Sequence, residues 1–173
     1  RMWGKCGESL NAVHVSPRLE EVTTSSLAAL KKYDAAMRAV DYDNTKAIAL
    51  LRDAIAIDTT FAMAYRKLGM ILEIDGRWGP ESDSALAQAY RYRDRLPDRE
   101  HYLAIASYFG DGPGRDRAKA VAAFETVLEL DSTNEIGLVN LSNLEASRRE
   151  FTTSARLIRR LLAQARSHED SAQ

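Results

Sequence analysis

The fold of this chain is decided by residues 54–72, which read AIAIDTTFAMAYRKLGMIL. Apolar residues at helical spacing predict the end of one helix, a short break at Asp58-Thr59-Thr60, and the start of a second helix. Small residues recur where two helices would touch: Ala54, Ala56, Ala62, Ala64 and Gly69. The stretch therefore predicts two closely packed helices joined by a tight turn.

The composition favours a helical chain without a membrane span. Of 173 residues, 45% are hydrophobic and 28% charged, and the nine Gly and four Pro are too few for a loop-rich β-sandwich. A net charge of −1 gives no overall attraction to nucleic acid or anionic lipid. The single cysteine, Cys6, excludes an intramolecular disulfide and a cysteine-rich zinc site. No apolar run reaches the ~20 residues that a membrane helix needs.

Helical periodicity continues on both sides of residues 54–72. Eight helices are expected, within residues 24–40, 43–58, 61–74, 80–96, 97–109, 115–131, 134–149 and 151–166. Ser25 or Ser26 is the expected N-cap of the first helix and Asn44 that of the second. In the first helix we expect Leu27, Leu30, Met37 and Val40 to share the buried face. No segment alternates like an exposed strand, so the expected class is all-α.

The helices repeat in pairs. A small residue followed four positions later by another apolar or small residue recurs in the second helix of each pair: Ala47/Leu51, Ala85/Ala89, Ala120/Phe124 and, with Ser154 as the small residue, Ser154/Ile158. The first members, at 47, 85, 120 and 154, are 38, 35 and 34 residues apart. A period near 34 residues in helix-turn-helix units predicts about four helix pairs stacked side by side.

The segment AYRKLGMIL (64–72) resembles the first helix of a tetratricopeptide repeat, with Tyr65 at the aromatic position and Leu68-Gly69 at the Leu-Gly step. In VNLSNLEASRREFTTS (139–154), Leu141 is kept and Ser142 replaces the glycine. A finer resemblance, covering most of the chain, is to tetratricopeptide regions of large bacterial signalling proteins, including membrane-anchored Ser/Thr kinases and regulators. The resemblance implies an all-α, right-handed α-solenoid of antiparallel helix pairs.

The resemblance also suggests how the chain is divided. We expect residues 1–24 to be an extension joining a preceding domain, 25–166 to be the repeat domain, and 167–173 to be a polar tail. The localisation is left open: the region is expected to be a soluble domain, in a protein that is membrane-anchored if the kinase resemblance holds. No kinase motif occurs in the chain, so no catalytic role is carried over.

In this family, residues one, five and eight positions after the aromatic residue line the concave groove. The groove residues implied here are Lys31, Arg38, Arg66, Met70, Glu73, Tyr102, Phe109 and Asn143, with Ala35, Ala106, Val139 and Ala146 beside them. An exposed stripe of Met70, Tyr102 and Phe109 would suit a peptide or helix. Lys31, Arg38 and Arg66 would give one end a basic bias and favour an acidic partner. The alternative is that these are core or solvated residues of a spacer.

Other candidate chemistry is weak. The loop GDGPGR (110–115) lacks the motif of a phosphate cradle and is expected to be a turn between paired helices. His14, His101 and His168 have no metal-ligand spacing, and Cys6 has no base and orienting acid at a recognisable spacing. We therefore expect no enzyme activity, cofactor, metal, nucleic-acid partner or membrane insertion. The expected function is binding of a protein or peptide on the concave face, with self-association (a homo-oligomer) as the alternative.

Overall fold

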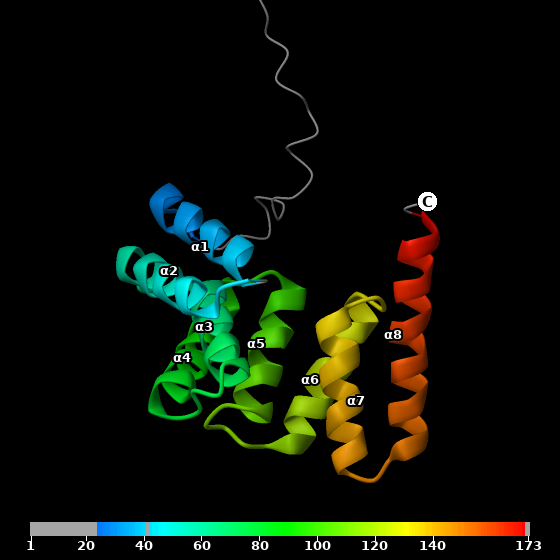
Figure 1. Ribbon diagram of the computed structural model, residues 1–173. Coiled ribbons are helices and arrows are strands. Elements are labelled where there is room, and N and C mark those ends of the chain that lie inside the picture. The colour runs from blue at the N-terminus through cyan, green and yellow to red at the C-terminus, as the bar shows by residue number, and fades with distance from the viewer. Residues whose placement is uncertain (1–23, 41, 172–173) are drawn as a thin grey trace, which may run out of the picture.

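The computed structural model describes residues 24–40 and 42–171, with side chains described up to residue 167. Cys6, His14 and nearly all of the expected N-terminal extension lie outside the described residues. Within the described ranges the chain is all-α, with no strand, as expected (Figure 1). The helices are α1 (Leu27–Ala39), α2 (Asn44–Ile57), α3 (Ala62–Ile74), α4 (Pro80–Arg91), α5 (Asp98–Gly110), α6 (Arg117–Leu130), α7 (Glu135–Ser147) and α8 (Phe151–Ser171), with a short 3-10 helix, η3 (Arg93–Arg95), before α5.

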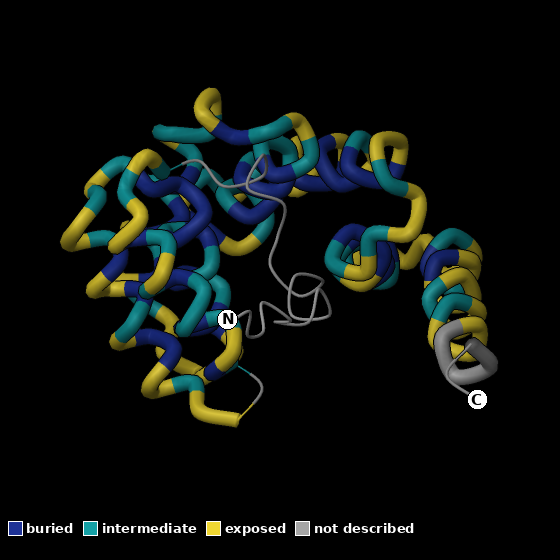
Figure 2. The backbone as a smooth tube through the Cα atoms, turned by 90° about the horizontal axis from the view of Figure 1, so that it is seen from above, coloured by how far each residue is buried: buried dark blue, intermediate teal, exposed yellow. Residues whose placement is uncertain are grey.

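The helices form four hairpins: α1/α2, α3/α4, α5/α6 and α7/α8. Consecutive hairpins pack through α2 against α3, α4 against α5, and α6 against α7. This is the architecture of an α-solenoid, as the repeat spacing predicted. The row of hairpins bends, which gives the stack an inner and an outer side (Figure 2). The handedness of the superhelix stays a prediction.

Side-chain caps start several of the helices. The Ser26 hydroxyl accepts from the backbone N–H of Ala29 at 3.2 Å, which confirms one of the two expected caps of α1. The expected cap at Asn44 is wrong, because the Asp43 carboxylate accepts from the Lys46 N–H at 2.9 Å. Asp116 and Asn134 cap α6 and α7 in the same way.

Of the residues expected on one face of α1, Met37 and Val40 pack half-buried against the core, but Leu27 does not. Leu27 is 64% exposed, and the buried residues are Ala29, Tyr33, Ala36 and Ala39. Three alanines let α1 approach α2 closely, and the Tyr33 ring packs against Phe61 of the next hairpin at 5.2 Å between centroids. Helical periodicity predicted that the larger aliphatic residues would share one face, whereas three of the four buried residues of this closely packed helix are alanines.

Two glycine positions are set by packing. A Cβ on Gly69 of α3 would lie 2.7 Å from side-chain atoms of Leu86 on α4, so only glycine permits this approach. In the α5–α6 loop, a Cβ on Gly112 would lie 3.0 Å from the Tyr108 carbonyl oxygen and 3.1 Å from Leu86. The loop is a turn between paired helices, as expected, and it also packs against the preceding hairpin.

The hydrophobic core consists of two clusters that meet at α5. One is built mainly from α1 to α4 and includes Ala104, whereas the other is built from α5 to α8 and includes Leu103. Neighbouring residues of one helix therefore belong to different clusters. Any contact from the α3 side to α5 helps to join the two halves of the stack.

Candidate binding surface on the inner helices

Arg66 is not an exposed groove residue. Its side chain is 2% exposed, and its guanidinium donates to the Glu100 carboxylate of α5 at 2.7 Å. Burial raises the pKa of the neighbouring Tyr33 hydroxyl to about 12, and the Arg66 charge acts against that rise. The expectation that Arg66 presents positive charge to a partner is wrong. Instead, the residue links the second hairpin to the third.

The remaining basic candidates give little support to an acidic partner. Lys31 and Arg38 are exposed on α1, but Arg38 pairs with Asp34 one turn earlier. Arg66 is buried and paired with Glu100, and Arg38 is paired at the surface. Of these three cations, only Lys31 is exposed without an ion-pair partner among the described residues. The basic bias expected at this end is therefore much reduced.

Tyr102 and Phe109 line a hollow separate from Asn143. This hollow, about 230 Å³, is formed by one face of α5 and by α6: Tyr102, Ile105, Phe109, Lys119, Ala122, Ala123 and Thr126. The Lys119 ammonium lies 4.9 Å from the centre of the Phe109 ring. Phe109 and Asn143, both predicted groove residues, therefore lie in separate hollows and not in one groove.

The two hollows are separated by a single step along α5. The α5 residue beside Asn143 is Gly110, one position after Phe109. One residue corresponds to about 100° of rotation around a helix, which moves a side chain to a different face. The family positions place Phe109 and Asn143 in one groove, whereas the structure places them in separate hollows.

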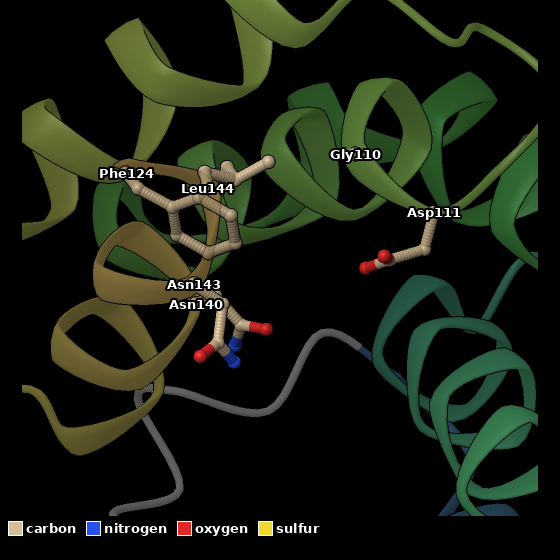
Figure 3. A pocket seen from close by; sticks show the side chains of 6 residues that line it. All are labelled: Gly110, Asp111, Phe124, Asn140, Asn143 and Leu144. Carbon is tan, nitrogen blue, oxygen red and sulfur yellow. The ribbon is translucent and has the colours of Figure 1, made fainter. Parts of the chain in front are cut away.

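Asn143 belongs to a pocket of about 170 Å³ between the third and fourth hairpins, which we call the Asp111 pocket. It is lined by Gly110, Asp111, Phe124, Asn140, Asn143 and Leu144 (Figure 3). Phe124 and Leu144 form an apolar wall. Figure 3 shows the two carboxamides on one side and the Asp111 carboxylate facing them from the other.

The polar groups of this pocket are incompletely used. The Asn140 amide nitrogen donates to the Ile136 carbonyl at 2.9 Å, which leaves its amide oxygen able to accept. Neither the Asn143 carboxamide nor the Asp111 carboxylate makes a side-chain hydrogen bond or ion pair within the described part of the chain. The surrounding protein displaces water and so raises the pKa of Asp111, although the side chain remains exposed. A raised pKa together with an exposed side chain is expected for a carboxylate in a concave surface.

Glu73, a predicted groove residue, lies buried near the same carboxylate. Its Oε1 atom has no hydrogen-bond partner, and burial, followed by the charges of Asp111 and Asp83, raises its pKa to about 7. The charge of Arg115 acts against this rise. The charges that act on Glu73 are therefore mainly negative, whereas the sequence predicted a basic bias at the end of the groove that carries Lys31, Arg38 and Arg66.

Sequence reasoning missed Asp111, Phe124, Asn140 and Leu144. Asp111 was interpreted only as part of a turn. The neighbouring Gly112 packs this loop against α4 and so holds the Asp111 carboxylate near the pocket. The usable signal was on α7, where Asn140 and Asn143 are three residues apart. Polar residues at this spacing share a face, so a polar pocket there was foreseeable.

The sequence matches no protein-family model, and no curated protein is significantly similar to it. Among the helices the structure describes, none combines the length and apolar character needed to cross a membrane. In the same part of the chain, no group of three or more His, Cys, Asp or Glu side chains is placed to hold a metal ion.

Proposed function

We propose that this chain is a non-catalytic interaction module of tetratricopeptide type, which binds a protein segment on its inner face within a larger bacterial signalling protein. The observation that carries the proposal is the Asp111 pocket, where unused hydrogen-bonding groups lie beside an apolar wall. The resemblance of residues 64–72 to a tetratricopeptide helix and the stack of four hairpins support it.

A peptide segment supplies the groups that this pocket lacks. A carboxamide such as that of Asn143 both donates and accepts, so it pairs with the N–H and C=O of a guest backbone. The wall formed by Phe124 and Leu144 offers apolar contact to a guest side chain. Pockets for small-molecule ligands are usually ~300–1,000 Å³, so a volume of about 170 Å³ fits one side chain of a longer guest better than a cofactor.

The test is selection of binding peptides from a random display library, followed by affinity measurement with labelled peptides. The test variant is Asn143→Arg, which fills the Asp111 pocket from an exposed helix position. The matched control is Ala122→Arg, at an exposed position in the separate α5/α6 hollow. We expect Asn143→Arg to weaken binding at least tenfold, equivalent to about 1.4 kcal/mol, and Ala122→Arg to change it little.

Two results would count against this assignment. The reverse pattern would move the binding surface to the Tyr102 hollow. Failure to select any peptide that binds the folded wild-type chain would remove the proposed function itself.

Self-association is a second candidate, favoured by the apolar surface of the last helix. On α8, Leu157 is buried against the stack, but Phe151, Ile158 and Leu162 are 64%, 45% and 52% exposed. A contact between these residues in two copies would bury them. Sedimentation velocity across a concentration series tests self-association. We expect the wild-type chain to form a dimer and the double variant Ile158→Glu/Leu162→Glu to remain monomeric. A wild-type chain that stays monomeric at all concentrations would exclude it.

A further inference from the structure

We propose that the Asp111 pocket selects a lysine or arginine side chain of the bound segment. This inference rests on the proposed function, because it names the chemistry of the guest at the same site. It reverses the acidic partner expected from the sequence.

The polar groups of the pocket offer mainly hydrogen-bond acceptors. Asp111 offers two carboxylate oxygens without a partner among the described residues, and the Asn140 amide oxygen is left free by the bond from its own nitrogen to Ile136. The Asn143 carboxamide adds a further acceptor oxygen. The two carboxamides also leave three N–H groups unused, against four acceptor oxygens, of which the two on Asp111 carry the negative charge. A lysine ammonium has three donors and an arginine guanidinium five, and neither accepts. A cationic head group therefore matches an acceptor-rich pocket.

The charged groups around the pocket also favour a cationic guest. Asp111 is partly desolvated without a counter-ion, and Glu73 is nine-tenths buried with one oxygen unpartnered. Asp83 adds negative charge to the Glu73 site, and Arg115 opposes it. A carboxylate that has lost part of its hydration gains from an adjacent cation. A guest carboxylate or phosphate would instead meet like charge.

The apolar wall of the pocket also suits a lysine or arginine side chain. Lysine and arginine have long aliphatic stems that pack on apolar surface while the charged head stays at a polar site. Phe124 and Leu144 lie on the same side of the pocket as the carboxamides, and Asp111 faces them (Figure 3). A stem lying on the wall would therefore direct its head group towards Asp111.

The experiment titrates the folded chain with single-residue probes and follows the side-chain amide signals of Asn140 and Asn143 by NMR. The probes are the N-acetyl methylamides of lysine, arginine and norleucine, the last being a neutral analogue of the lysine stem. We expect saturable shifts of the two amide signals with the lysine and arginine probes. We expect at least tenfold weaker binding of norleucine, as for loss of a hydrogen bond to a charged group. Asp111→Asn, which keeps the shape and removes the charge, should reduce the preference for the cationic probes to about twofold or less.

Equal shifts with all three probes, or no shift of these amides with the cations, would overturn the inference. The peptide selection separates its failure from failure of the proposed function. Selected peptides that lose affinity on Asn143→Arg but show no enrichment of lysine or arginine would leave the function in place and overturn this inference. Enrichment that persists in a selection against Asp111→Asn would also overturn it.

Discussion

Breaking the buried pair between Arg66 and Glu100 should destabilise the stack and separate its two halves. The guanidinium and the carboxylate are 2.7 Å apart, with side chains 2% and 9% exposed. Glu100→Gln leaves the buried Arg66 charge without its ion-pair partner and should lower the free energy of unfolding by about 3–5 kcal/mol. Arg66→Met should cost less, because Glu100 keeps a second cation, Arg99, 3.6 Å from its carboxylate.

The position of the pair predicts how the variants unfold. Arg66 on α3 and Glu100 on α5 join the hairpins where the two core clusters meet. In a repeat protein, each interface stabilises only its two neighbours, so weakening one interface lets the two sides unfold separately. We expect urea denaturation followed by circular dichroism to change from one transition to two in Glu100→Gln.

The matched control is the double variant Arg66→Met with Glu100→Leu. Replacing a buried ion pair by apolar residues of similar size is often neutral or stabilising by ~1–4 kcal/mol. The double variant should therefore recover most of the stability lost in either single variant, with a coupling free energy of several kcal/mol. Costs below about 1 kcal/mol for both single variants would refute the reasoning, because surface ion pairs give values of that size.

Three further changes test particular contacts. The folded-state pKa of Glu73 is raised from 4.5 to about 7, so its contribution to stability is complete below pH 4.5 and is lost as the pH rises through 7. Glu73→Gln should therefore stabilise the fold at pH 8 by up to about 3 kcal/mol. In urea titrations the variant should show a flatter dependence of stability on pH. Gly69→Leu should cost ~1–3 kcal/mol in thermal unfolding because its side chain overlaps Leu86, and a neutral result would contradict the packing assigned to that glycine. Asp43→Ala should cost about 1 kcal/mol and Asn44→Ala much less, since only Asp43 caps α2; equal costs would refute the cap.

The fold was predictable because several independent patterns agree on it. Helical periodicity, turn residues such as Asp58-Thr59-Thr60, and the spacing of the small residues all indicate paired helices. Gly69 was predicted as a packing residue and is confirmed by its approach to Leu86. These features depend on neighbours within one hairpin, which sequence spacing describes well.

The surface was harder to predict because it depends on contacts between hairpins. Arg66 is charged and fits an exposed groove position, but Glu100 of the next hairpin buries it. Phe109 lines the α5/α6 hollow, and its neighbour Gly110 lines the Asp111 pocket. Neither effect follows from the residues of a single repeat.

The central claim, that the inner face at Asp111 and Asn143 binds a peptide, is tested most directly by locating a bound peptide. The measurement is paramagnetic broadening of NMR signals by a spin label attached to a peptide from the display selection. We expect strong broadening at Asn140, Asn143 and Asp111, with little at Ala122 and Thr126 in the α5/α6 hollow. Broadening confined to Ala122 and Thr126 would contradict it.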